Sequence, residues 1–202
     1  MSEIPITLPF ELDKRVSDMT FLYSHFAKVE IDRAVNKCPN ITRIAGGTDS
    51  VVIDFNNRVY KAYFATHNSL NEYHKTVNSE KLLIYQEITN QTAVSAPHIY
   101  EKDGVEYTFL VNPIFEMGYS EELGVWVGIS DMIAGVNVVN HNEEFTPIFK
   151  KMSQVIINNS GYKGVNIVSK NVKLLDMPGT GRHKVLMVTD LCSDIADLEK
   201  DC

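Results

Sequence analysis

The chain has 202 residues, enough for one domain with a buried core or for a domain with a short appendage. Its apolar fraction of 44% and charged fraction of 22% are typical of a globular protein. The sequence contains no run of about eighteen apolar residues, the length that would predict a membrane span. The net charge of −7 argues against a nucleic-acid partner, because binding to phosphates needs a basic surface. Three scattered cysteines and the absence of a secretory signal at the N-terminus favour a cytoplasmic location.

The first quarter of the chain predicts a long helix and then three strands. Residues 11–35 place apolar side chains at three- and four-residue steps, the spacing of one helix face, and Pro39 ends this pattern. Three short runs rich in β-branched and aromatic residues then predict strands at 41–45, 51–55 and 58–64, the last two joined by an Asn56-Asn57 turn.

A second helix and two more strands are predicted next. Residues 68–89 become amphipathic after a polar start and should pack on the preceding strands. Residues 98–101 and 105–111 predict strands around a turn at 102–104. The order β-β-β-α-β-β predicts a five-stranded antiparallel sheet with one helix on its face, an α+β architecture.

The second half of the chain is expected to be more helical. Residues 143–158 carry an apolar stripe at helical spacing. Two further strands, 172–175 and 185–188, flank a loop with proline and glycine and therefore predict a hairpin.

A turn of small residues lies between the first two predicted strands. Ala45-Gly46-Gly47-Thr48-Asp49-Ser50-Val51-Val52 resembles the glycine-rich loop, GxGxxGxV, that covers the phosphates in protein kinases. Ala45, Gly47, Ser50 and Val52 stand in the four key places. Small residues suit this role because backbone N–H groups must approach phosphate oxygens closely, although alanine and serine weaken that approach.

The third predicted strand carries Lys61. The segment Val59-Tyr60-Lys61 resembles the kinase strand whose lysine holds the α- and β-phosphates. The resemblance implies a glutamate partner for Lys61 in the helix that follows. Glu80 is favoured because it lies beside the apolar stripe of the helix, while Glu72 and Glu87 are the alternatives.

The end of the fifth predicted strand resembles the kinase hinge. Residues 107–111 run into 112–118, a segment that includes Glu116 and Met117. In kinases, backbone groups of this segment bind the adenine edge while apolar side chains cover its faces. The resemblance therefore implies that Glu116 and Met117 contact the nucleotide.

Two late residues resemble the magnesium ligands of kinases. Asn171 and the strand after it resemble the asparagine that closes the catalytic loop, and Asp190 follows a strand as the DFG aspartate does. Both side chains offer oxygen, which Mg²⁺ prefers. The resemblance implies that Asn171 and Asp190 bind the metal.

The sequence departs from the kinase pattern where the catalytic base is expected. Five residues before Asn171 stands Asn166, whose amide cannot accept a proton as the usual aspartate does. Leu191 and Cys192 replace the Phe-Gly of the DFG motif. Only 202 − 190 = 12 residues follow Asp190, too few for an activation segment and the helices that dock peptide substrates.

Taken in order, these segments resemble the protein-kinase-like superfamily, and in particular the reduced kinases of phages and of bacterial effectors. The resemblance implies an α+β kinase-like fold, with an N-terminal helical extension (1–40), a five-stranded N-lobe and hinge (41–118) and a truncated helical C-lobe (119–202). ATP and Mg²⁺ would be the ligands. A cellular protein, in the host cytoplasm for an effector, would be the partner.

Three interpretations of the sequence stay open. The missing base favours a pseudokinase that acts through a partner protein, while the retained lysine and metal ligands suit an active atypical kinase or another nucleotide-group transferase. In the third interpretation the chain is an α+β domain whose residues only imitate the pattern.

Overall fold

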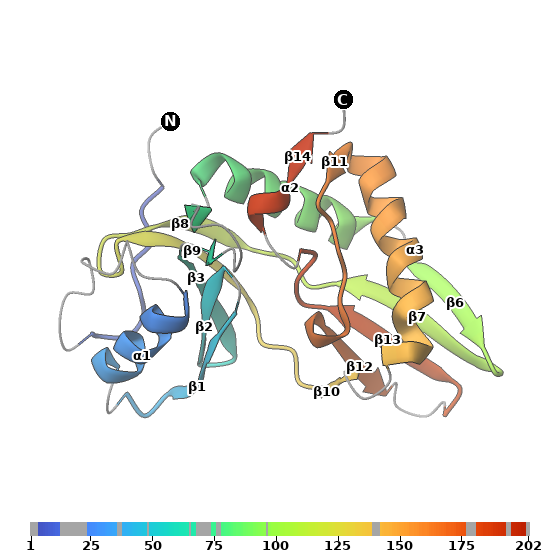
Figure 1. The fold of residues 1–202 in the computed structure, drawn as a ribbon. Helices are drawn as coiled ribbons and strands as arrows, with labels where there is room; N and C mark the ends of the chain where they lie inside the picture. Colours follow the sequence, from blue (N-terminus) through green and yellow to red (C-terminus); the bar gives the residue numbers. More distant parts are fainter. Residues whose placement is uncertain are drawn as a thin grey trace. The chain divides into compact units, whose positions relative to one another are not determined.

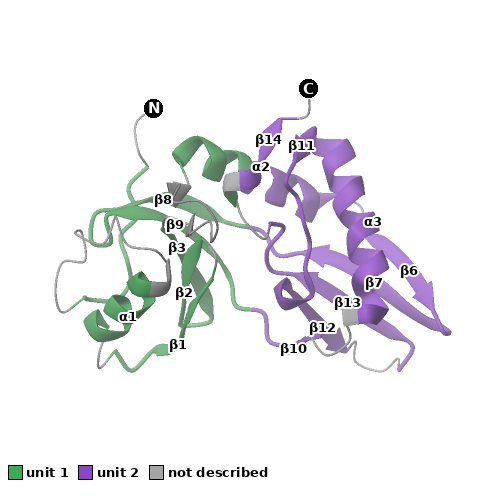
Figure 2. Ribbon diagram, viewed as in Figure 1, with its two compact units in different colours: residues 1–84, 114–132, 194–196 green, residues 85–113, 133–193, 197–202 purple. Residues whose placement is uncertain are grey.

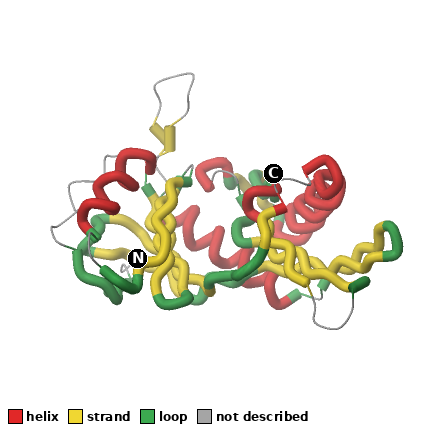
Figure 3. The backbone as a smooth tube through the Cα atoms, turned by 90° about the horizontal axis from the view of Figure 1, so that it is seen from below, coloured by secondary structure: helices red, strands yellow, loops and turns green. Residues whose placement is uncertain are grey.

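The structure, a computed structural model, describes residues 4–12, 24–35, 38–47, 49–64, 66–67, 74–75, 78–95, 97–138, 142–176, 181–192 and 195–200. Helices and strands mix along the chain, which confirms the predicted α+β class (Figure 3). The chain divides into two compact units (Figure 2). Unit 1 comprises residues 1–84, 114–132 and 194–196, and unit 2 comprises 85–113, 133–193 and 197–202. This partition differs from the predicted boundaries at residues 40 and 118.

Unit 1 is built on a five-stranded antiparallel sheet (Figure 1). Its order is β1 (Ile41–Gly46), β2 (Ser50–Phe55), β3 (Arg58–Tyr63), β9 (Val125–Asp131) and β8 (Glu116–Ser120). The first three strands were predicted, and so was the turn between β2 and β3, where Asn56 and Asn57 have φ of 48° and 62°. Asparagine tolerates this left-handed conformation, which gives the turn a twist that matches the strands.

The last two places in this sheet were predicted wrongly. Residues 98–101 and 105–111 were expected there, but the β8–β9 hairpin occupies them. Residues 105–111 and 125–131 are both rich in β-branched and aromatic residues, so composition does not say which of the two hairpins pairs with β3.

The N-terminal segment belongs to the core of unit 1. Helix α1 (Ser24–Ala34) contributes Ala27 and Ile31, both at 0% exposure, to a cluster with Val51 and Ile53 of β2. The predicted helix 11–35 is thus confirmed over 24–34, whereas residues 11–12 are not helical and 13–23 lie outside the described residues. Residues 4–6 run along β8, where the backbones of Ile6 and Tyr119 share a 2.8 Å hydrogen bond.

Unit 2 contains a mixed five-stranded sheet, so the second half is less helical than predicted. Its order is β10 (Val136–Asn137), β12 (Val172–Asp176), β13 (His183–Val188), β7 (Val105–Val111) and β6 (His98–Lys102). The β6–β7 and β12–β13 hairpins confirm the predicted strand pairs, and β13 joins β7 in parallel. The β11 strand (Tyr162–Lys163) pairs separately with β14 (Glu199–Lys200).

Two helices complete the described fold. Helix α3 (Asn142–Ser160) confirms the prediction over 143–158, and its Phe145 ring meets Tyr107 of β7 edge-on with centroids 5.3 Å apart. Helix α2 (Ser79–Val94) begins later than predicted, because the Asn78 side chain caps it by accepting the N–H of Lys81 at 2.8 Å. Before it, β4 (Thr66–His67) pairs with β5 (His74–Lys75). Within the described ranges, no helix combines the length and apolar character needed to cross a bilayer.

Candidate functional site

Unit 1 aligns four of the predicted nucleotide-binding residues in one row across its sheet. Ala45 lies opposite Val52, Val52 opposite Lys61, Lys61 opposite Gly128, and Gly128 opposite Met117. Directly opposed residues of an antiparallel sheet project to the same face. A Cβ on Gly128 would lie 3.1 Å from the Met117 methyl carbon, so glycine leaves the space that Met117 fills.

The opposite face of the same sheet forms the hydrophobic core of unit 1. Ala62 and Val127, which neighbour Lys61 and Gly128 along their strands, are 0% exposed in that core. Because successive residues of a strand alternate between faces, Lys61 is directed away from the core. Lys61 is half-buried, so its stem lies against neighbouring groups of its own face.

The turn between β1 and β2 is tight and partly buried. The Gly47 N–H donates to the Ser50 carbonyl at 2.7 Å, and Ser50 is only 3% exposed. The Asp49 carboxylate, 6% exposed, accepts the N–H of Ile195 at 3.1 Å. Burial of Ser50 argues against its predicted phosphate contact, so Gly46 and Gly47 are the accessible part of this loop.

The remaining predicted residues of unit 1 differ in accessibility. Glu80 is exposed in the first turn of α2, and its pairing with Lys61 remains a prediction. Of the two predicted hinge residues, Glu116 is exposed at the start of β8, whereas Met117 is 2% exposed within it. Glu72, an alternative partner for Lys61, lies outside the described residues.

An ion pair between an exposed arginine and a buried aspartate lies on the same face of the sheet as Lys61. Asp54 stands two residues after Val52 in β2, and Arg43 Nε meets its Oδ2 at 2.8 Å. Its second oxygen, Oδ1, is buried with no hydrogen-bond partner among the described atoms. This face therefore carries both charge signs and is not a uniformly positive phosphate surface.

Unit 2 places the two predicted metal ligands at the same end of the β12–β13 hairpin. The β12–β13 hairpin pairs Val172 with Val188, so the residues just beyond, Asn171 and Thr189, also adjoin. Thr189 donates both its N–H (2.8 Å) and its hydroxyl (3.0 Å) to the Asn171 carbonyl. The Asn171 amide reaches the Cys192 carbonyl at 3.5 Å, and the Cys192 N–H reaches Asp190 Oδ1 at 3.3 Å. Asn171 and Asp190 therefore flank the same short stretch of backbone.

Asn166, which the resemblance assigns to the position of the kinase base, lies at the same end of the hairpin. Its backbone N–H donates to the Leu191 carbonyl at 2.9 Å, and its neighbours Val165 and Ile167 are 4% exposed. Asn166 itself is exposed. The three predicted residues of unit 2 thus converge on residues 190–192.

Tyr85 also contacts Asp190, and the sequence analysis missed it. Its hydroxyl donates to Asp190 Oδ1 at 2.6 Å and accepts the Leu191 N–H at 3.4 Å. Tyr85 is 1% exposed and belongs to a buried stripe of α2 with Leu82, Ile88 and Thr89. That spacing was present in the sequence, but the stripe predicted for this helix ran through Ile84 and Ile88, and of these two only Ile88 belongs to the buried stripe.

The donor set at Asn171 and Asp190 fits a hard cation better than a soft one. One carboxylate and one carboxamide offer oxygen atoms, and Mg²⁺ is commonly held by one or two such ligands together with phosphate. Within the part of the chain that the structure describes, no three His, Cys, Asp or Glu side chains gather as a metal site.

A second polar cluster of unit 2 joins β7 to β13. The Thr108 hydroxyl lies 2.8 Å from His183 Nε2, and His183 Nδ1 lies 3.1 Å from the Glu106 carboxylate. Hydroxyl, imidazole and carboxylate occur in this order in activated nucleophiles. However, β7 is hydrogen-bonded to strands on both sides, so its backbone N–H groups are not available to stabilise an oxyanion. The cluster is best explained as a cross-strand contact that supports the parallel pair.

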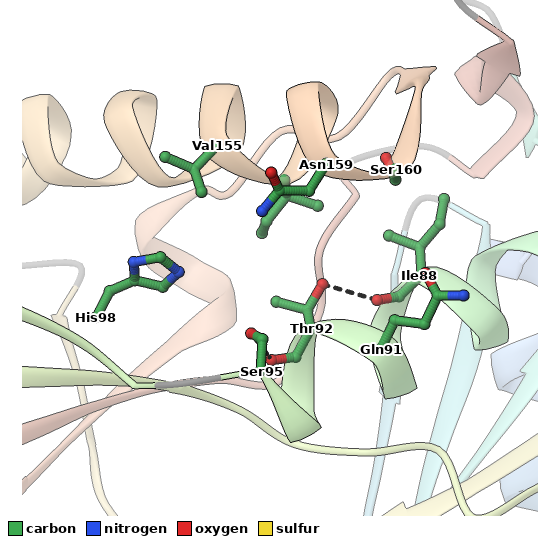
Figure 4. Close-up of a pocket in the computed structure, with 9 residues that line it drawn as sticks. Ile88, Gln91, Thr92, Ser95, His98, Val155, Asn159 and Ser160 are labelled. Atoms are coloured by element: carbon green, nitrogen blue, oxygen red, sulfur yellow. Dashed lines mark hydrogen bonds between the residues drawn. The ribbon is translucent and has the colours of Figure 1, made fainter.

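A small pocket of unit 2 lies between α2, α3 and the start of β6 (Figure 4). Its volume is about 90 Å³, well below the roughly 300–1,000 Å³ of typical small-molecule sites. The hydroxyls of Thr92 and Ser95 in its wall are used locally, since each donates to a backbone carbonyl of α2 at 2.7 Å. This pocket is too small for a nucleotide.

Comparison with known proteins adds no family: no protein-family model matches the sequence, and no curated protein matches it significantly. The structure itself shows an α+β chain of two compact units.

Proposed function

We propose that this protein binds ATP together with Mg²⁺ as a reduced kinase-like domain, and that it acts chiefly as a pseudokinase through a cellular protein partner. Lys61 and the glycines of the β1–β2 turn are the proposed phosphate-binding groups. Asn171 and Asp190 are the proposed metal ligands.

The observation that carries the proposal is that Asn171 and Asp190 lie at the same end of the β12–β13 hairpin, where both side chains hydrogen-bond the backbone of Cys192. The two residues come from separate segments of the sequence, and the kinase-like resemblance assigns both of them to the metal. Further support comes from the row in unit 1, where Val52 and Lys61 are direct cross-strand neighbours. The kinase-like resemblance assigns both residues to the nucleotide.

The absence of a catalytic base favours nucleotide binding over phosphoryl transfer as the function. An amide at Asn166 has no site basic enough to take the proton of a substrate hydroxyl at neutral pH. Positioning and charge neutralisation supply most of phosphoryl-transfer catalysis, so an atypical transferase is the second candidate. It is favoured by the same pair, Asn171 and Asp190, which a purely structural domain would not require.

A thermal-shift titration tests the binding. ATP with Mg²⁺ in excess should raise the Tm of the wild type by several degrees, because a ligand at a hundred times its Kd adds about 2.7 kcal/mol to stability. Lys61→Met and Asp190→Asn should each lose most of this shift. Asp176→Asn is the matched control, since this carboxylate is 87% exposed at the far end of β12. An unchanged Tm in the wild type, or an equal shift in Asp190→Asn, would contradict the proposal.

Radiolabelled ATP separates the two candidate functions. Wild-type protein incubated with γ-labelled ATP and cellular protein should transfer no more label to that protein than the Asp190→Asn variant does. The Asn166→Asp variant, which restores a carboxylate in the position of the base, is the informative companion. Transfer by the wild type that disappears in Asp190→Asn would establish the transferase instead.

A further inference from the structure

The contact between Tyr85 and Asp190 is short and protected. The donor–acceptor distance of 2.6 Å is in the range of hydrogen bonds from a hydroxyl to an ionised carboxylate, which are about twice as strong as neutral ones. Tyr85 is 1% exposed, while Asp190 is half-buried. The protected hydroxyl therefore holds a carboxylate that is still partly accessible.

Two donors act on the same oxygen of Asp190. The Tyr85 hydroxyl and the Cys192 N–H both reach Oδ1, at 2.6 and 3.3 Å. Donors from a helix and from the loop backbone fix the rotation of the carboxylate about its Cβ–Cγ bond. Asp190 is thus held in one orientation before any ligand binds.

Tyr85 is itself held by further hydrogen bonds, so the position of α2 helps to fix the loop that contains Asp190 and Leu191. Its hydroxyl also accepts the N–H of Leu191, a residue at 0% exposure. Its carbonyl accepts the Thr89 hydroxyl at 2.7 Å within the same helix. The phenol therefore joins α2 to two consecutive residues of the loop that ends β13.

We propose that Tyr85 is a positioning residue for the metal-binding carboxylate of Asp190. This inference rests on the proposed function, because it concerns the affinity of the same site for a divalent cation. Hydrogen-bond partners that orient a metal ligand typically contribute 10–100-fold to metal affinity. The opposite role, a latch that competes with the metal for Asp190, would change the affinity in the other direction.

The test measures the Kd of Mn²⁺, a paramagnetic substitute for Mg²⁺, by electron paramagnetic resonance on the full chain with a non-hydrolysable ATP analogue present. Tyr85→Phe removes the hydroxyl and keeps the ring, and it should weaken Mn²⁺ binding by about 10–100-fold. The control is Tyr107→Phe, the same change in another buried tyrosine of unit 2, where burial raises the pKa of the hydroxyl. This control should leave the Kd of Mn²⁺ unchanged.

The outcomes separate this inference from the proposed function. If Asp190→Asn leaves Mn²⁺ binding intact, the proposed metal site is wrong, and the role of Tyr85 is overturned with it. If Asp190→Asn abolishes binding while Tyr85→Phe binds as tightly as the wild type or more tightly, only the positioning role is overturned. Should Tyr85→Phe not fold, Tyr85→3-fluorotyrosine retains both hydrogen bonds with a more acidic donor. Tighter Mn²⁺ binding at an unchanged Tm then supports the positioning role, because the stronger donor holds Asp190 more firmly, whereas an unchanged or weaker affinity overturns it.

Discussion

Replacing Ile31 with alanine should lower the free energy of unfolding of unit 1 by about 2–5 kcal/mol. Ile31 is 0% exposed on α1 and belongs to the same apolar cluster as Val51 and Ile53 of β2. Removing its outer carbons leaves a cavity between helix and sheet, and partial collapse does not recover the lost contacts. The result would show that the N-terminal helix stabilises the core of unit 1.

Urea denaturation measures this effect selectively. Trp126, the only tryptophan of the chain, lies in β9, so its fluorescence reports on unit 1. The matched control is Phe26→Ala on the same helix, where the side chain is 55% exposed and the change should stay within about 0.5 kcal/mol. Equal midpoints for the two variants would mean that α1 does not stabilise the sheet.

Replacing Gly164 with alanine should destabilise unit 2 by about 3 kcal/mol or more. Gly164 has φ of 92°, and a Cβ there would lie 2.4 Å from the backbone oxygen of Asp197. The left-handed conformation alone costs a non-glycine residue about 1–2 kcal/mol. The clash adds to this cost, because a backbone atom cannot move aside as a side-chain end can. The loop before Asn166 would therefore shift.

A second glycine separates the free-energy cost of the left-handed conformation from that of the clash. Gly161 has φ of 71°, but a Cβ there would meet nothing within 4 Å, so Gly161→Ala should cost only about 1–2 kcal/mol. Far-UV circular dichroism in urea, with hydrogen exchange at β12 and β13, follows both variants. Equal losses for Gly161→Ala and Gly164→Ala would contradict the close approach between Gly164 and Asp197.

Much of the candidate site in unit 2 could be predicted from local sequence. A hairpin over 172–188 follows from its two apolar runs and the turn residues between them, and such a hairpin necessarily brings its two ends together. Asn171 and Asp190 therefore lie at the same end of the hairpin, as the structure has them. Tyr85 could not be placed in the same way, because a helix periodicity identifies a buried face but not the loop against which it packs.

The sequence by itself determined the local elements: the strands of the β6–β7 and β12–β13 hairpins, the Asn56-Asn57 turn, the α+β class and helix α3. These features depend on neighbouring residues, since alternation, helical spacing and left-handed turns are properties of short segments. Only the tertiary structure decided that β9 pairs with β3 and that β7 pairs in parallel with β13. The physical reason is that an apolar face needs to be covered, and several segments of similar pattern can cover it equally well.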